Sequence, residues 1–210
     1  MLLLHNYRCK SYSRLEERLY LCRQTGEHIN NRNMPSPADI RYIPPAGRDG
    51  GLLNSLTALW ESSVRATHHF LREADIRNLK PYVTEGLAGI RHLYVAADAA
   101  APTAFIGIQD EKIEMLFVSP QHLRKGIGKR LVDMAVRKHG TVFVDVNEQN
   151  PAARAFYEKL GFVESGRTET DGQGNPFPII EMRRKDFPIE TTRDLTIKTE
   201  LKMYRKSLEL

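Results

Sequence analysis

Apolar residues recur with two different periods between residues 40 and 182, and each period predicts a different element. Short alternating or continuous apolar runs predict β-strands, whereas apolar residues three and four positions apart predict helices. The expected strands are residues 40–43, 92–96, 103–108, 113–118, 141–146, a strand beginning at 162–163, and 178–182. The expected helices are residues 51–70, 126–139 and 151–160, the last with Pro151 in its first turn and Gly161 beyond its end.

Proline and turn residues set the expected breaks between these elements. Pro81 interrupts the helical pattern of residues 71–91, so we expect two short helices, one around Asp75 to Leu79 and another around Val83 to Ile90. Residues 97–102 are expected to form a turn and residues 109–112 a hairpin loop. This order predicts an α/β protein with a mixed, largely antiparallel sheet flanked by helices.

The globular pattern occupies residues 38–185, with an extension at each end. Residues 1–37 are basic and contain linker chemistry around Asn30, Asn31 and Pro35, so we expect a loosely ordered arm that a chain starting at Met34 would lack. Residues 186–210 carry a partly amphipathic pattern. That tail would dock on the domain, join a second subunit, or form a frayed polar helix.

Composition narrows the class of protein. The 210 residues are 41% hydrophobic and 27% charged, which is ordinary for a globular chain, and the net charge is +5. Only about +2 of this falls in residues 38–185, too little for the basic footprint of a nucleic-acid binder. Apolar runs are far short of a membrane span, and Cys9 and Cys22 suggest no disulfide framework or metal site. We therefore expect a cytoplasmic protein with no membrane, nucleic-acid or metal partner.

A basic glycine loop follows the strand at 113–118 and opens the helix at 126–139. Gly126 and Gly128 leave the backbone accessible where the N–H groups of a helix start, at Ile127 among them, have no internal partner. Four cationic side chains surround this turn, namely Arg124, Lys125, Lys129 and Arg130. The loop lacks the P-loop pattern, and Leu131 stands where a dinucleotide fingerprint has its third glycine. It is therefore either a pyrophosphate site or a tight turn with a solvated basic face.

A second motif follows the next strand and favours the pyrophosphate site. Asn150, Ala153, Phe156, Tyr157, Gly161 and Phe162 fit the pattern N-x-x-A-x-x-[FL]-Y-x-x-x-G-F. Over residues 38–185 the chain resembles the GNAT superfamily of N-acetyltransferases, which combine this motif with a basic glycine loop. Segments 63–71, 146–150 and 174–178 resemble a group of small bacterial members, one of which is described as a peptidyl-lysine acetyltransferase.

The resemblance implies a GNAT-like fold with acetyl-CoA as co-substrate. Its pantetheine arm would lie between the diverging strands 113–118 and 141–146, against main-chain groups of Leu116, Phe117 and Val118. The loop from Arg124 to Arg130 would hold the pyrophosphate, and Asn150 corresponds to a cofactor-contacting Asn. The chain departs from the family at Leu123, where Gln or Arg is usual, so some affinity for the cofactor is in doubt.

Amine acetylation needs a base for the acceptor and an acid for the departing thiolate. Tyr157 stands at the family's general-acid position, although its ring could simply pack on the sheet. Glu114 is one candidate base. Alternation along the strand places it on one face with Leu116 and Val118, and places Ile113, Met115 and Phe117 on the other face. His68 is the other candidate base, or it binds substrate, and Asn147 could bind the acceptor or the cofactor. The alternatives are a solvated or salt-bridged Glu114 and a His68 that is only a helix-end or surface residue.

The expected activity is direct acetyl transfer from acetyl-CoA to a primary amine. The acceptor would be a lysine side chain, a protein N-terminus or a small amine, and the protein a monomer or homodimer. The alternative is a GNAT-shaped module that senses an acyl-CoA without turnover, which Leu123 slightly favours and Tyr157 and Asn150 disfavour.

Overall fold

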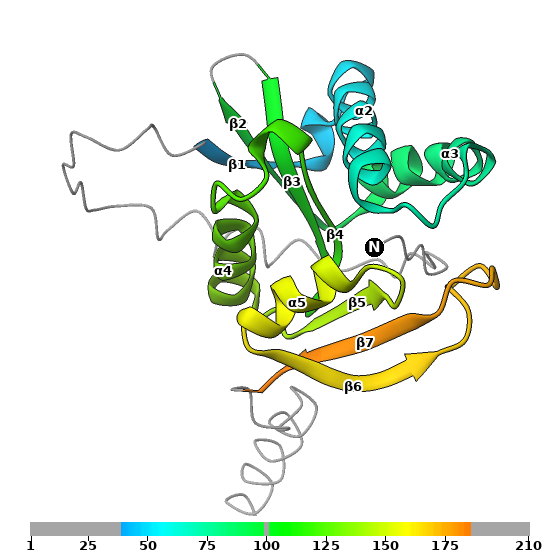
Figure 1. Ribbon diagram of the computed structural model, residues 1–210. Coiled ribbons are helices and arrows are strands. Elements are labelled where there is room, and N and C mark those ends of the chain that lie inside the picture. The colour runs from blue at the N-terminus through cyan, green and yellow to red at the C-terminus, as the bar shows by residue number, and fades with distance from the viewer. Residues whose placement is uncertain (1–38, 99–100, 186–210) are drawn as a thin grey trace, which may run out of the picture.

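The computed structural model describes residues 39–98 and 101–185, which form one sheet with helices on both faces (Figure 1). The strands are β1 (Asp39–Ile43), β2 (His92–Asp98), β3 (Ala101–Gln109), β4 (Lys112–Val118), β5 (Phe143–Asn147), β6 (Phe162–Thr168) and β7 (Ile179–Arg184). The helices are α2 (Gly50–Thr67), α3 (Glu73–Gly89), α4 (Ile127–His139) and α5 (Pro151–Lys159), with short 3-10 turns η2 (Pro45–Gly47) and η3 (Pro120–His122). The arm 1–37 and the tail 186–210 lie outside the described residues, and their expected structure stays a prediction.

The sheet has the order β1-β2-β3-β4-β5-β7-β6. All neighbouring strands run antiparallel except β4 and β5, which are parallel. The predicted mixed, largely antiparallel sheet is therefore confirmed. In Figure 1 the sheet falls into two parts, β1 to β4 beside α2 and α3, and β5, β7 and β6 with α5 across them.

Alternation along β2 shows how the two faces are covered. Leu93 and Val95 belong to a buried cluster with Trp60 of α2 and Leu87 of α3, whereas Tyr94 and Ala96 belong to a second cluster with α4 and α5. Because successive strand residues point to opposite faces, α2 and α3 cover one face and α4 and α5 the other. Any group that joins the two faces must therefore pass through or around the sheet.

Helix α3 is continuous, so the expected break at Pro81 is wrong. Proline removes one helical N–H bond, but Ile76, Leu79, Val83 and Leu87 form a single buried stripe that passes across it. Pro81 itself lies on the exposed side of the helix. Burial of the whole stripe outweighs the one missing hydrogen bond.

Several predicted boundaries also shift. Strands β2 and β3 extend into the expected turn at 97–102, and β6 continues to Thr168. Helix α2 ends at Thr67 instead of residue 70, with His68 as its C-cap. The loop between β3 and β4 is the expected hairpin, and Asp110 adopts a φ of 52° there.

The predicted faces of β4 are wrong at Ile113. Gly107 faces Met115 while Ile108 faces Ile113, so Glu114 is an extra residue without a partner of its own on β3. This β-bulge shifts the alternation. Ile113 consequently packs in the α4–α5 cluster together with Leu116 and Val118, whereas Met115 and Phe117 pack against α2 and α3.

Candidate active site

The basic loop, residues 123–130, runs from the end of η3 into the first turn of α4. Two of its residues have left-handed backbone conformations. Arg124 has a φ of 61° and Gly126, the N-cap of α4, a φ of 79°. Within the described residues, the N–H groups of Ile127, Gly128 and Lys129 have no backbone acceptor, and the first such bond of α4 is Arg130 N–H to the Gly126 carbonyl. These N–H groups and the helix dipole form a place for an anion.

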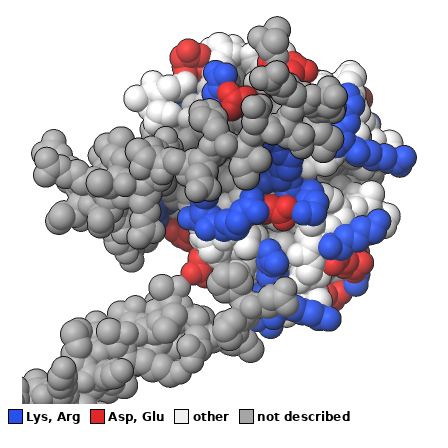
Figure 2. Space-filling model, turned by 90° about the vertical axis from the view of Figure 1, so that its left-hand side faces the viewer, with Lys and Arg blue, Asp and Glu red and all other residues white. Residues whose placement is uncertain are grey.

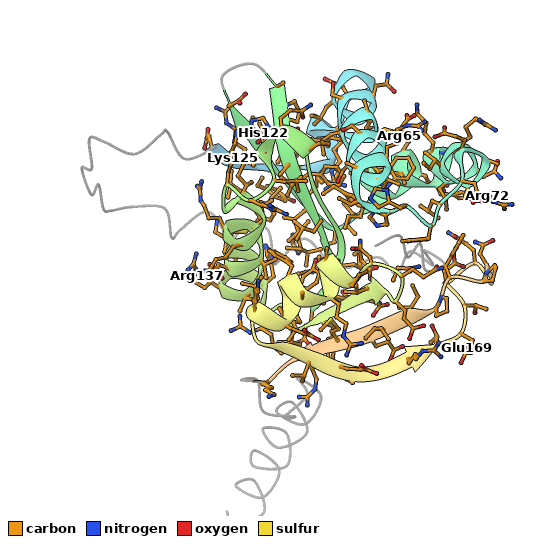
Figure 3. The ribbon with its side chains drawn as sticks, viewed as in Figure 1. Arg65, Arg72, His122, Lys125, Arg137 and Glu169 are labelled. Atoms are coloured by element: carbon orange, nitrogen blue, oxygen red, sulfur yellow. The ribbon has the colours of Figure 1, made fainter. Side chains whose placement is uncertain are left out.

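Cationic side chains surround this helix start. Arg124, Lys125 and Lys129 are exposed and Arg130 is half-buried, while Lys129 also pairs with Asp133 at 2.5 Å. Figure 2 shows Lys and Arg side chains gathered on the face of the molecule where α4 lies. In Figure 3, Lys125 and His122 lie at the beginning of α4. Backbone donors and positive charge thus meet at one site.

The two loop glycines have different roles. A Cβ at Gly126 would meet nothing within 4 Å, so its left-handed backbone is what requires glycine there. A Cβ on Gly128 would lie 3.4 Å from the Phe156 ring of α5, an ordinary van der Waals distance, so this glycine lies where α4 contacts α5. This neighbour was not visible in the sequence.

Strands β4 and β5 separate soon after they begin. They pair only at Lys112 with Phe143 and at Ile113 with Val144, so the residues from Glu114 onward have no β5 partner. The predicted divergence is thereby confirmed, and the β5-facing edge of Leu116, Phe117 and Val118 borders the resulting strand gap. In Figure 1, β5 runs away from β4 toward the α3 side of the molecule.

Glu114 lies at the point where the strand gap opens. Its Oε2 is buried and has no hydrogen-bond partner within the described residues. Burial raises the pKa of this carboxyl to about 7, and Asp145 and Asp110 add to the rise while Lys112 opposes it. Lys112 is itself ion-paired with Asp145. A carboxyl that titrates near neutrality suits proton transfer.

Tyr157 lies on the other side of the sheet from α2. Its ring is buried in the α4–α5 cluster, in edge contact with Phe156 and Phe162 at centroid distances of 5.0 and 5.5 Å. Burial raises the pKa of its phenol, which therefore keeps its proton at neutral pH. The side chain fits both the packing role and the acid role considered for it.

Asn150 has a structural task that the sequence motif does not reveal. Its Oδ1 accepts the Ala153 N–H at 3.1 Å, which makes it the N-cap of α5. The residue is buried in the turn between β5 and α5. The capping bond leaves its amide NH₂ group as the part that a cofactor would contact.

His68 is held in one orientation and one tautomer. The Thr67 hydroxyl donates its only proton to the Ser63 carbonyl at 2.8 Å, so its oxygen can only accept the proton of His68 Nδ1, 2.8 Å away. Burial, far more than the charge of the neighbouring His69, lowers the pKa of His68 to about 2. The ring is therefore neutral with its lone pair on Nε2, a hydrogen-bond acceptor but a weak base.

A pocket brings His68 and Asn147 together, and we call it the His68 pocket. It is lined by His68, Phe70, Leu71, Leu79, Asn147, Asp171, Phe177 and Ile179. Asn147 Oδ1 accepts the Gln149 N–H at 2.8 Å, which fixes the side chain. Figure 3 shows Arg72 and Glu169 on this side of the molecule, away from Lys125.

Sequence reasoning named only His68 and Asn147 among these lining residues. Phe70 and Phe177 lie within segments that carried the family resemblance, and their rings meet at 5.8 Å. Asp171 lies in no recognised motif, and only the folded β6–β7 loop brings it to the pocket. Glu114 and Tyr157 do not line this pocket.

Two features of other protein classes are absent from the described residues. None of the described helices is long and apolar enough to cross a bilayer. Nor do the described residues contain a cluster of three or more His, Cys, Asp or Glu side chains suited to a metal ion.

Comparisons with known proteins agree with this geometry. A family model described as an acetyltransferase (GNAT) domain matches residues 62–185. The chain is 36% identical over 127 residues to the peptidyl-lysine N-acetyltransferase YjaB of Salmonella typhimurium. The matched region covers 60% of this chain and 88% of that protein.

Two solved structures extend the comparison to the fold. The solution structure of apo YjaB from Escherichia coli matches with a TM-score of 0.62 and 31% identity, over 70% of this chain and 97% of that one. The PaiA N-acetyltransferase of Thermoplasma acidophilum was solved with coenzyme A and matches with a TM-score of 0.52 and 22% identity. This match covers 69% of this chain and 98% of that one. The basic loop, the strand gap and these matches together show that the chain belongs to the GNAT family of N-acetyltransferases.

Proposed function

We propose that this protein transfers the acetyl group of acetyl-CoA directly to a primary amine while both substrates are bound. The observation that carries the proposal is the strand gap, which lies between the α4–α5 face with Tyr157 and the α2–α3 face with the His68 pocket. A thioester in this gap would be reached by the acid from one face and by the amine from the other.

The basic loop provides the cofactor end of this site. The N–H groups of Ile127 and Gly128 would bind the pyrophosphate, and Arg124, Lys125, Lys129 and Arg130 would neutralise its charge. Main-chain groups of Leu116, Phe117 and Val118 would pair with the pantetheine amides, and the Asn150 amide would add a contact. The PaiA enzyme was solved with coenzyme A, which supports a coenzyme A derivative as the co-substrate.

The catalytic groups divide the two proton movements. Glu114 takes a proton from the acceptor, directly or through water, so that the amine nitrogen can form its bond to the acetyl carbonyl carbon. Tyr157 protonates the sulfur as the carbon–sulfur bond breaks. Their pKa values favour these roles, because Glu114 is partly ionised at neutral pH and Tyr157 is not.

His68 is better suited to orient the amine than to deprotonate it. Its Nε2 lone pair can accept an N–H hydrogen bond, but a group with a pKa of about 2 gains little by taking the proton. Asn147 would offer its amide NH₂ group beside it. The relatives named as peptidyl-lysine N-acetyltransferases favour a lysine side chain among the acceptor classes considered.

Mass spectrometry and initial-rate kinetics test direct transfer. Incubation with acetyl-CoA alone should leave the protein mass unchanged, and varying both substrates should give intersecting double-reciprocal lines. A stoichiometric acetyl-protein that passes its acetyl group to the amine, with parallel lines, would contradict the proposal.

A further inference from the structure

A buried carboxylate in the His68 pocket has no opposite charge beside it among the described residues. Asp171 is 8% exposed, and among the described residues it takes part in no ion pair. The pocket lining contains neither Lys nor Arg, and His68 is neutral. A buried negative charge without a cation is costly unless hydrogen bonds or a ligand compensate it.

The hydrogen bonds of Asp171 compensate only part of this charge. Oδ1 accepts the N–H groups of Gln173 and Asn175, each at 2.9 Å, and Oδ2 accepts the Asn175 side-chain amide at 2.9 Å. A carboxylate offers about four acceptor positions, so one position on Oδ2 remains for a further donor. These bonds also hold the carboxylate in place within the β6–β7 loop.

The rest of the lining is suited to an apolar chain. The ring centroids of Phe70 and Phe177 lie 5.8 Å apart. Leu71, Leu79 and Ile179 complete the apolar surface. Aromatic faces also attract a cation that lies over them. An aliphatic chain that ends in a charged nitrogen therefore matches both parts of the pocket.

We propose that the His68 pocket admits the acceptor as an alkylammonium ion, with Asp171 as its counter-ion and Phe70 and Phe177 along its methylene stem. The inference rests on the proposed function and adds the charge state and chemical class of the acceptor. The ammonium then loses one proton toward Glu114. As the new carbon–nitrogen bond forms, the nitrogen regains positive charge, so Asp171 stabilises both the bound acceptor and the transition state. The nitrogen then loses its second proton to solvent as the carbon–sulfur bond breaks, and the departing thiolate takes the proton of Tyr157.

This role predicts a particular kinetic signature for Asp171→Asn. The amide oxygen can still accept the loop N–H groups, but the charge is lost. An interaction made equally in the bound state and the transition state changes KM and leaves kcat nearly constant. We expect the KM for n-butylamine to rise at least tenfold, with KM for acetyl-CoA and kcat changed less than twofold.

An uncharged acceptor amine shows whether Asp171→Asn acts through the lost charge or through a changed pocket shape. The KM for an aryl amine such as p-anisidine, which is neutral at pH 7.5, should change less than twofold in Asp171→Asn. Glu169→Gln removes an exposed charge from the same loop and is the matched control. This control should retain the wild-type KM for n-butylamine.

Direct binding keeps this test independent of turnover. In an NMR titration, n-butylammonium should shift Asp171 and Phe177 resonances in the wild-type protein and bind at least tenfold more weakly to Asp171→Asn. If n-butylammonium binds the wild-type protein more tightly than Asp171→Asn but no amine is acetylated, the proposed function fails and the pocket assignment stands. Equal n-butylammonium binding by the two proteins, or an equal rise in KM for both amines, would overturn the assignment of Asp171.

Discussion

Replacement of Glu114 by Gln should lower activity and raise stability at the same time. The side chain lies at the opening of the strand gap with its Oε2 buried and without a partner among the described residues. A glutamine has nearly the same shape but cannot accept a proton as a base. General bases typically contribute on the order of 10²–10⁴-fold, so kcat should fall by about that factor.

The pKa of Glu114 gives the size and pH range of the stability change. Burial raises its pKa from 4.5 to about 7, so the folded protein binds this proton more tightly than the unfolded chain does. Stability from the protonated form is fully present below pH 4.5 and is lost as pH rises through about 7. Glu114→Gln avoids this loss, which corresponds to about 3 kcal/mol well above pH 7.

Two measurements on the same variant test this reasoning. Urea unfolding from pH 4.5 to pH 8.5 should show a free-energy advantage of Glu114→Gln that grows with pH, and the acid limb of the wild-type rate profile, with its midpoint near 7, should disappear. Glu164→Gln, an exposed carboxylate of β6, is the matched control. An unchanged acid limb together with a pH-independent stability difference would refute the role of Glu114.

Three further predictions concern the acid, the loop and the arm. Tyr157→Phe keeps the buried ring and removes the proton donor, so kcat should fall by about 10²–10⁴-fold with little change in KM for acetyl-CoA; a loss below threefold in a folded variant would favour the packing role alone. Gly126→Glu introduces a negative charge and a strained backbone at φ 79°, and calorimetry should show at least tenfold weaker acetyl-CoA binding, about 1.4 kcal/mol; Asp133→Asn, on the same helix, should not weaken it. A chain that starts at Met34 should melt within a few degrees of the full chain and keep its acetyl-CoA affinity, because β1 begins only at Asp39; a large loss of thermal stability would show that residues 1–33 pack on the domain.

The fold followed from the sequence wherever local patterns and packing agree. The apolar stripe of α4 fits only a helix, and the valine-rich run of β5 fits only a strand, so each pattern allowed a single prediction. Pro81 misled the prediction of α3, because a local rule cannot weigh one lost hydrogen bond against the burial of a stripe on both sides of it. Ile113 was misplaced because a bulge depends on the pairing with β3, which alternation along β4 alone does not contain.

The candidate site was predictable only in part, for a related reason. The basic loop and Tyr157 lie in contiguous motifs, so their residues could be named from the family resemblance that these motifs carry. His68, Asn147 and Asp171 are far apart along the chain and meet only in the folded pocket. The charge states of Glu114 and His68 depend on burial, which no motif reports.

Product analysis by mass spectrometry tests the central claim most directly. The full-length protein is incubated with isotopically labelled acetyl-CoA and a lysine-containing peptide, and released CoA and labelled peptide are quantified together. We predict equal amounts of CoA and singly acetylated peptide, modified at the lysine amine, with turnover lost in Glu114→Gln. Tight binding of acetyl-CoA without an acetylated amine, for this peptide and for a panel of N-terminal and small primary amines, would contradict the account and indicate an acyl-CoA-binding module.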